Sequence, residues 1–269
     1  MTNDRPIRVK KRGPIAVLLT ITAIAVAVLL LAGGILYVTG IRYVRAQSDL
    51  GVIKFFGRVD KEGLPISGTI VYPGGARAKL KAGEREITYS NGDVYEGSLK
   101  NLMKDGAGKL TYKNGDVYEG EFAADKPDGK GLYIYANGDR YEGEFAAGQK
   151  DGAGEYVWAD GSVYKGEFRR DKKHGDGVFT WVNGDVYEGE YKDDLKEGRG
   201  IYRFKNGDVY EGSYVGDVRS GQGVYTWANG ERYEGNFRDN VMWGEGVYTW
   251  PSGRVYTGYF ENGVIVRVE

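Results

Sequence analysis

The chain has 269 residues, of which 44 are glycine and 22 are tyrosine, and it contains no cysteine and only one histidine. This composition excludes disulfides, thiolate metal sites, cysteine nucleophiles and multi-histidine centres, and so many aromatic residues are untypical of a disordered chain. The net charge of −1 is unevenly spread, because seven of the 37 basic residues and only one of the 38 acidic residues precede position 47. An acidic body does not resemble a nucleic-acid-binding domain, so we expect no nucleic-acid partner.

The N-terminal part of the sequence has the composition of a membrane-spanning helix. No charged residue occurs from Ile15 to Ile41, and a helix of that length exceeds the ~30 Å hydrocarbon core of a bilayer. We predict a transmembrane helix over 15–41, with a basic cytoplasmic N-terminus over 1–14 and a linker over 42–54. The excess of basic residues before the helix predicts a single-pass protein whose remaining residues are extracytoplasmic. The alternative is a cleaved signal peptide, although its apolar segment would be unusually long.

The remaining sequence repeats with a period of 23 residues. A turn pair recurs at this interval without an insertion: Asn91-Gly92, Asn114-Gly115, Asn137-Gly138, Asp160-Gly161, Asn183-Gly184, Asn206-Gly207, Asn229-Gly230 and Ser252-Gly253. A tyrosine lies four residues after the start of each pair: Tyr95, Tyr118, Tyr141, Tyr164, Tyr187, Tyr210, Tyr233 and Tyr256. Large apolar residues in each unit alternate with a period of two, which is typical of strands.

Both ends of this array depart from the pattern. Residues 55–90 predict a degenerate capping repeat, in which Pro73-Gly74-Gly75 stands in place of a turn pair but lies too close to the next one. Terminal repeats are expected to be atypical because they have only one neighbour. The regular array covers 91–263, and residues 264–269 predict one further strand or cap.

The unit resembles a MORN repeat (membrane occupation and recognition nexus). The resemblance rests on the run from Asn114 to Phe122, followed by the glycines Gly129 and Gly131, and it extends over about residues 55–263. It implies an all-β repeat protein in which stacked β-hairpins form one elongated, twisted antiparallel sheet. It also implies scaffold work, self-association and contact with lipid.

The hairpin turns predict that the aromatic residues share one face of the sheet. A two-residue loop at Asn114-Gly115 would place Tyr112 and Tyr118 on opposite faces, whereas a three-residue loop places them on the same face. Pro251 favours the longer loop, since a type I turn accepts proline there and Gly253 then takes the left-handed position of a G1 bulge. Glycines two residues after each tyrosine are expected to leave space beneath the rings. Pairs such as Gly129 and Gly131 are expected to serve the connecting loop and the entry of the next strand.

Two interpretations of the aromatic face stay open. It is the core of a thin repeat structure, or it binds a partner through the residues Tyr118, Tyr141, Trp158, Tyr164, Trp181, Tyr187, Tyr210, Trp227, Tyr233 and Trp250. The acidic residues that follow the tyrosines, such as Glu119 and Glu188, are expected to face water. His174 is assigned to a surface loop. A site repeated eight times offers no asymmetric constellation for catalysis, so we expect no enzyme activity, no metal and no cofactor.

The sequence therefore predicts a non-enzymatic, membrane-anchored scaffold or protein-interaction rod. The alternative function is a lipid- or glycan-binding module that uses the aromatic face. At the C-terminal end, Val264, Ile265 and Val266 form a β-prone segment with no later repeat to cover it. Since unpaired edges invite pairing, we expect this edge to mediate homodimerisation or to bind a strand of an unidentified protein partner.

Overall fold

The computed structural model describes residues 14–81 and 86–266. The basic N-terminus expected over 1–14 lies outside the described residues except for its last residue, as do the final three residues of the predicted segment 264–269. The predicted all-β class is confirmed, because 21 strands form a single open and twisted antiparallel sheet. By compactness the chain divides into Met1–Ile87 and Thr88–Glu269, and each unit is described by itself.

The first unit begins with helix α1 (Pro14–Val38). Thr39 closes its C-terminal end by donating from Oγ1 to the carbonyl of Ile35 (2.9 Å), and Gly40 then leaves the helix with φ +73°. In the fully described part of the chain, to which α1 contributes residues 25–36, no helix is long and apolar enough to cross a membrane. The structure thus does not support the predicted membrane-spanning helix over 15–41.

Four antiparallel strands follow α1 in the first unit. Their bounds are β1 (Ile41–Ser48), β2 (Gly51–Val59), β3 (Pro65–Val71) and β4 (Arg77–Leu80), with the 3-10 turn η1 (Pro73–Gly75) between the last two. The residues predicted as a linker over 42–54 instead form most of β1 and the start of β2, because Val44, Ile53 and Phe55 alternate with outward polar residues.

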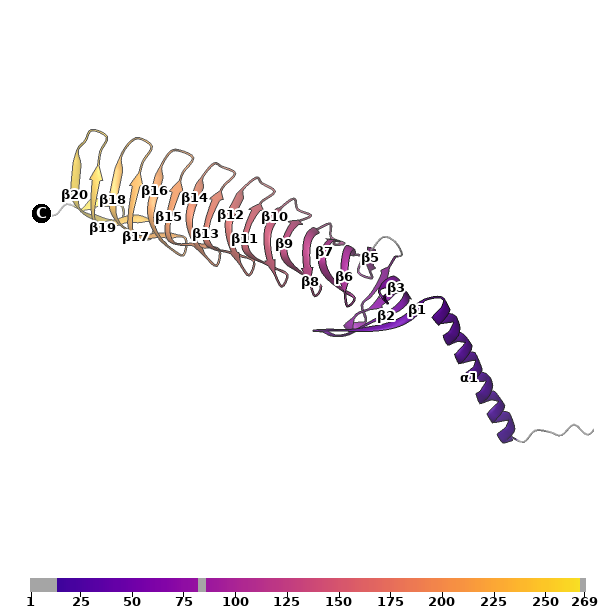
Figure 1. The fold of residues 1–269 in the computed structure, drawn as a ribbon. Coiled ribbons are helices and arrows are strands. Elements are labelled where there is room, and N and C mark those ends of the chain that lie inside the picture. Colours follow the sequence, from indigo (N-terminus) through magenta and orange to yellow (C-terminus); the bar gives the residue numbers. More distant parts are fainter. Residues whose placement is uncertain (1–13, 82–85, 267–269) are drawn as a thin grey trace, which may run out of the picture. The chain divides into compact units, whose positions relative to one another are not determined.

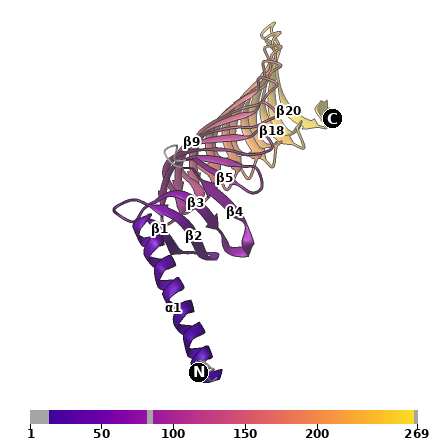
Figure 2. The same ribbon diagram turned by 90° about the vertical axis from the view of Figure 1, so that its right-hand side faces the viewer.

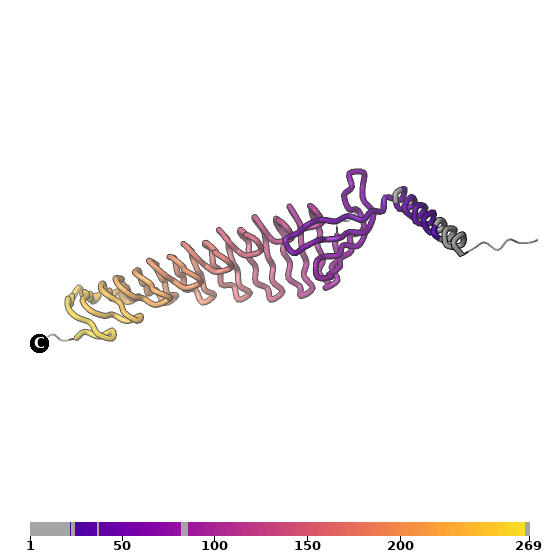
Figure 3. Tube along the Cα trace, turned by 90° about the horizontal axis from the view of Figure 1, so that it is seen from below, coloured from indigo at the N-terminus to yellow at the C-terminus, as the bar shows by residue number. Residues whose placement is uncertain are grey.

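The second unit is a regular stack of hairpins, seen along its length in Figure 1 and from below in Figure 3. After β5 (Glu86–Tyr89) at the boundary, its strands are β6 (Val94–Lys100), β7 (Met103–Thr111), β8 (Val117–Ala123), β9 (Lys126–Ile134), β10 (Arg140–Ala146), β11 (Gln149–Val157), β12 (Val163–Arg169), β13 (Lys172–Thr180), β14 (Val186–Lys192), β15 (Leu195–Arg203), β16 (Val209–Val215), β17 (Val218–Thr226), β18 (Arg232–Arg238), β19 (Val241–Thr249), β20 (Val255–Glu261) and β21 (Val264–Val266). From β6 onward each strand pairs with its neighbours in sequence. Figure 2 shows the strands of this array one behind another.

The three-residue hairpin loop predicted from Pro251 is confirmed. Tyr112 N–H donates to the carbonyl of Asp116 (2.9 Å), and Gly115 N–H donates back to the carbonyl of Tyr112 (3.0 Å). Gly115 has φ +97°, the left-handed conformation that a G1 bulge requires. The turn at Pro73-Gly74-Gly75 closes in the same way, with Gly75 N–H donating to Tyr72.

The opposite ends of the strands carry tighter turns that the sequence interpretation missed. Ala124 and Asp125 form the two-residue loop between β8 and β9, and both have positive φ (47° and 72°). This is the type I′ geometry, which asparagine, aspartate and glycine tolerate best. Gly129 and Gly131 both lie in β9, so the expected place in the next strand holds and the expected place in the connecting loop does not. Gly129 adopts φ +98° at a bulge opposite Glu121, and Gly131 pairs with Gly120.

The core consists of the tyrosine series folded over the glycine columns. Tyr141 lies across Gly143 and Gly154, and a Cβ added at Gly143 would come within 2.5 Å of the Tyr141 hydroxyl and 2.6 Å of Gly154 Cα. The hydroxyl donates to the carbonyl of Glu144 (3.0 Å), so the ring is buried without leaving its polar atom unpaired. The expected steric role of the glycines is thus confirmed.

Candidate functional site

The six tyrosines proposed from sequence as binding residues lie in the core. Their exposed fraction is 0 %: Tyr118, Tyr141, Tyr164, Tyr187, Tyr210 and Tyr233. Each ring packs edge-to-face on aromatic residues of its own and the next repeat, as Tyr118 does on Phe122 and Phe145 at centroid distances of 5.0 and 5.1 Å. A partner cannot reach these rings while the sheet is intact, so the core interpretation holds for this row.

The four predicted tryptophans lie instead in a half-buried strip, which we call the aromatic ribbon. It consists of Tyr112, Tyr133, Tyr135, Tyr156, Trp158, Phe179, Trp181, Tyr202, Phe204, Tyr225, Trp227, Tyr248 and Trp250, and the centroids of successive rings are 4.3 to 6.0 Å apart. The sequence interpretation missed alternate members, such as Tyr133 and Tyr156. Their signal was a large apolar residue two positions before each predicted ring.

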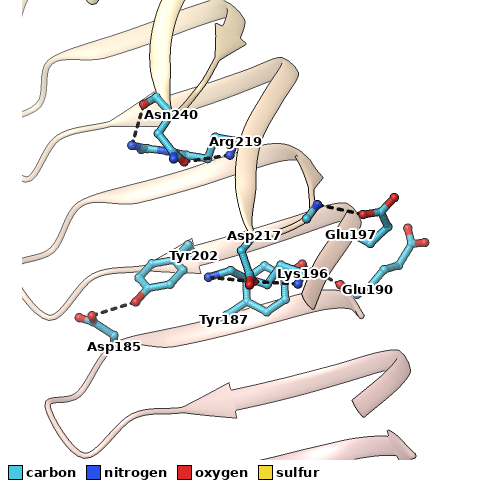
Figure 4. A network of polar contacts seen from close by, with 10 residues as sticks. Asp185, Tyr187, Glu190, Lys196, Glu197, Tyr202, Asp217, Arg219 and Asn240 are labelled. Atoms are coloured by element: carbon cyan, nitrogen blue, oxygen red, sulfur yellow. Dashed lines mark hydrogen bonds and ion pairs between the residues drawn. The ribbon is translucent and has the colours of Figure 1, made fainter. Parts of the chain in front are cut away.

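Tyrosines of the ribbon join neighbouring repeats through the aspartates that follow the turn glycines. Tyr202 Oη donates to Asp185 Oδ2 (2.9 Å) (Figure 4). The other carboxylate oxygen, Asp185 Oδ1, accepts from Lys205 N–H (2.8 Å). The backbone bond holds the pKa of Asp185 below its usual value. Asp185 Oδ2 also accepts from Asn183 Nδ2 (3.1 Å) in its own turn, so the carboxylate holds its own turn as well as the turn of the next repeat. Where serine replaces aspartate, at Ser162, the facing ring is Phe179, which has no hydroxyl to donate.

A second feature that the sequence did not reveal is a row of cations on the aromatic face, the cation ladder. Its members are Lys104, Lys150, Lys173, Lys196 and Arg219. Lys196 Nζ lies 5.5 Å from the Tyr187 centroid, 5.3 Å from Tyr202 and 3.9 Å from Asp217 Oδ1 (Figure 4). Burial lowers the pKa of Lys196, and the nearby Asp217 carboxylate opposes that shift.

Each cation is matched to one residue of the next type I′ turn. Lys196 N–H donates to Asp217 Oδ1 (2.9 Å), and Lys173 N–H makes the same bond to Asp194. Two repeats lack the cation and have Pro127 or Met242 in its place; there the facing turn residue is Gly148 or Gly263, without a carboxylate. Each lysine of the ladder therefore faces an aspartate, whereas Arg219 faces Asn240 and donates from its guanidinium to the carbonyl of that residue (2.8 Å). The cation and its polar turn residue form one interaction that spans two repeats.

The other side of the sheet carries the exposed residues Glu119, Glu188 and Glu211, and we call it the carboxylate face. A groove of about 1150 Å³ crosses β12 to β18 there. Apolar side chains alternate along it with the predicted acidic row: Glu188 pairs in register with Ile201, and Glu211 with Val224. Arg232 forms an ion pair with Glu234 at 2.7 Å. The acidic residues Glu119, Glu188 and Glu211 are exposed as expected.

The remaining predicted positions can be placed directly. His174 lies in β13 opposite Glu167, so its assignment to a surface loop is wrong. Its Nδ1 atom is buried without a hydrogen-bond partner and lies 3.9 Å from Asp193 Oδ1. Val264 and Ile265 are exposed in β21, which pairs only with β20 among the described strands. The predicted terminal strand is thus present and ends the sheet.

Stacked hairpins of fixed length, with a buried tyrosine over paired glycines, define a β-repeat protein. The model of the MORN repeat family matches residues 95–117, 118–140, 141–163, 164–186, 187–209, 210–232 and 233–253. These matches cover more than half of the 269 residues, and the chain belongs to the MORN-repeat family. The family model recognises seven units, where the turn pairs had indicated eight.

The solved structures that match this chain are distant from it. One is the TCP domain of Drosophila melanogaster SAS-4 in complex with a proline-rich motif of Ana2, with 14 % identity, a TM-score of 0.34, and coverage of 72 % of this chain and 90 % of that chain. Another is an inactive virginiamycin B lyase from Staphylococcus aureus, with 10 % identity, a TM-score of 0.17, and coverage of 82 % and 85 %. No functionally characterised protein matches the sequence.

Proposed function

We propose that this MORN-repeat protein is a non-enzymatic scaffold that binds a protein partner along its carboxylate face. The observation that carries the proposal is the groove across β12 to β18, whose floor includes Val178, Ile201 and Val224. The aromatic face is already filled by its own tyrosines and cation ladder. The carboxylate face offers both a hollow and exposed apolar area, which is the anatomy of an interaction surface.

The spacing of the acidic row defines the chemistry of the partner. Glu188 and Glu211 lie two strands apart, which corresponds to about 9.6 Å at ~4.8 Å per strand. An extended or polyproline II segment that runs across the strands advances about 3.1–3.3 Å per residue. Every third side chain of such a segment would therefore meet a carboxylate. The partner that fits is an extended segment with lysine or arginine at every third position and apolar residues between.

Site-specific photocrosslinking in the native cell tests this assignment. A crosslinker at Ile201 should capture one partner, whereas a crosslinker at Val182, in a turn beside the aromatic ribbon, should not. The captured segment should then bind the purified protein directly, and Glu188→Lys with Glu211→Lys should abolish that binding while Lys192→Glu leaves it unchanged. Capture from Val182 but not from Ile201 would place the partner on the aromatic ribbon and overturn the proposal.

The aromatic ribbon supports the alternative function. Trp158, Trp181, Trp227 and Trp250 keep part of each indole exposed, and aromatic rings of this kind bind sugars or lipid by stacking and apolar contact. Binding of soluble glycans or of neutral vesicles that is lost in Trp181→Ala and Trp227→Ala, with the carboxylate face intact, would favour a glycan- or lipid-binding module over the protein scaffold.

Membrane attachment and an extracytoplasmic location are part of the proposal on sequence grounds. They rest on the uncharged run from Ile15 to Ile41 and on the basic residues before it. Alkaline extraction of membranes should leave the protein in the pellet, and protease added to intact cells should digest the repeats. Release by alkali, or repeats that stay intact until the membrane is permeabilised, would contradict attachment or orientation respectively.

A further inference from the structure

The charged residues on the outward face of strands β1 to β4 are all basic. Ile53, Phe55, Ile70 and Leu80 are buried on one side of β1 to β4, so the alternate residues must point to the other side. The charged residues at these outward positions are all basic and all exposed: Arg45, Lys54, Arg58, Arg77 and Lys79. No acidic residue occupies an outward position in the four described strands β1 to β4. We call this surface the basic face.

Two aromatic rings lie exposed within the basic face. Tyr43 and Phe56 are opposite each other in the β1–β2 register, and their exposed fractions are 57 % and 55 %. The next pair in the same register is Arg45 and Lys54, so the ring pair adjoins a pair of positive charges. Large exposed rings are costly on a surface that faces only water, and basic charges placed side by side repel each other. Both features are explained together if an anionic, partly apolar surface covers the face.

We propose that the basic face binds the anionic headgroups of phospholipids at a membrane surface. Basic clusters of this size are attracted to acidic lipids, and aromatic rings favour the headgroup region, where one side is apolar and the other is wet. The helix α1 ends at Val38, three residues before β1, and its side chains over residues 25–36 are apolar and exposed. A nucleic acid or an acidic protein would use the charges but leave that apolar surface and the ring pair uncovered.

The basic face lies outside the matched repeats, which begin at residue 95. It is also a different surface from the groove proposed to bind a protein. The two proposals therefore fail or succeed separately, since variants of one surface leave the other unchanged.

Lysine labelling of the full chain in vesicles tests the proposal by position. The protein is reconstituted in phosphatidylcholine vesicles, with or without about a third of phosphatidylglycerol, and treated with an amine-reactive reagent before mass spectrometry. Lys54 and Lys79 should react several-fold more slowly when phosphatidylglycerol is present, and salt should remove the difference by screening. Lys192 and Lys205, on the repeats, should react equally in both. Equal labelling of Lys54 and Lys79 in the two vesicle types would overturn the proposal.

Variants of the full chain then separate the two components of the face. Replacing Arg45, Lys54, Arg58 and Lys79 by glutamine should lower the preference for anionic over neutral vesicles by roughly two to three orders of magnitude. Tyr43→Ser with Phe56→Ser should weaken binding to both vesicle types. Neutralising four exposed basic residues of the repeats (Lys165, Lys192, Arg203 and Lys205) is the matched control and should change neither.

An unchanged lipid preference in the first variant, with an unchanged circular dichroism spectrum, would refute lipid binding here. Equally tight binding of polyglutamate, insensitive to the two serine substitutions, would assign the face to an acidic polymer instead.

Discussion

Tyr202 donates a hydrogen bond from its hydroxyl to Oδ2 of Asp185, 2.9 Å away and 17 residues earlier in the chain. The two residues lie in adjacent repeats, so the bond holds one unit to the next. The same pair recurs as Tyr133 with Asp116, Tyr156 with Asp139 and Tyr225 with Asp208. At one junction both members differ, because Phe179 faces Ser162.

Asp185→Ala should destabilise the array by about 1–3 kcal/mol, because the Tyr202 hydroxyl and the Lys205 amide both lose a charged acceptor. Adding Tyr202→Phe to Asp185→Ser copies the natural pair and should cost less than the sum of the single changes. Urea unfolding of the wild type, Asp185→Ser, Tyr202→Phe and the double variant measures the coupling energy between the two residues. Strict additivity would show that the bond does not link the repeats.

Gly143→Val should destabilise the fold by roughly 1–3 kcal/mol through overpacking against the Tyr141 ring. The loss should extend to the adjacent repeats, since the stability of a repeat array depends on neighbouring interfaces. Amide hydrogen exchange, read repeat by repeat, checks this. Ala153→Val, at an exposed position beside the paired Gly154, is the control. If amide protection in Gly143→Val were unchanged, the glycine column would have no steric role.

Lys196→Met should destabilise the protein because Asp217 loses its positive neighbour, and the added change Asp217→Gly should restore much of the loss. That double variant copies Met242 facing Gly263 in the same chain. Glycine also suits position 217, where the backbone has φ +71°. Melting temperatures of the wild type, the two single variants and the double variant are compared. A double variant less stable than Lys196→Met would contradict the pairing.

The free energy of unfolding should fall as the pH rises above about 10. Burial raises the pKa of Tyr118 and of Tyr210 from 10.0 to about 12, so the unfolded chain loses these protons first and ionisation favours unfolding. The stabilisation is complete below pH 10 and is lost as the pH approaches 12.

The buried lysines act in the opposite sense, because their pKa values are lowered, but the buried tyrosines are more numerous. Urea unfolding at a series of pH values gives the slope, which Tyr118→Phe should reduce. A stability that is flat or rising across this range would contradict the burial of the tyrosines.

The β21 edge should mediate association of two chains. Val264 and Ile265 are exposed there, and an unpaired strand offers a row of free backbone groups. Light scattering in detergent should show a dimer for the full chain and a monomer for a chain that ends at Asn262. Ile265→Lys, which keeps the strand but adds a charge to its exposed surface, should also be monomeric. Dimers in all three proteins would place self-association elsewhere.

The regular part of the fold could be predicted from the sequence, because the turn residues and the alternation of large apolar residues are compatible with one hairpin geometry. Pro251 and Gly253 fit a three-residue turn, and that turn places Tyr112 and Tyr118 on one face. The type I′ turns and the bulges escaped prediction because Gly129 and His174 lie in polar, glycine-rich stretches that resemble loops. The cation ladder escaped because lysine and arginine are expected in water, whereas here each cationic group lies over aromatic rings. The groove depends on the shape of the whole sheet, which no local pattern encodes.

The pairing between Tyr202 and Asp185 also governs how the array can change in length. Deleting residues 187–209 would bring Tyr225 opposite Asp185, and Tyr225 already bonds an aspartate, Asp208, in this chain. Deleting residues 164–186 would bring Tyr202 opposite Ser162 and remove the phenylalanine that suits it. Gain or loss of a single unit is therefore neutral where tyrosine and aspartate recur on both sides, and costly next to the Ser162–Phe179 junction. Whether a repeat can be gained or lost thus depends on the residue pair at the junction that forms, and the sequence of the 23-residue segment alone does not decide it.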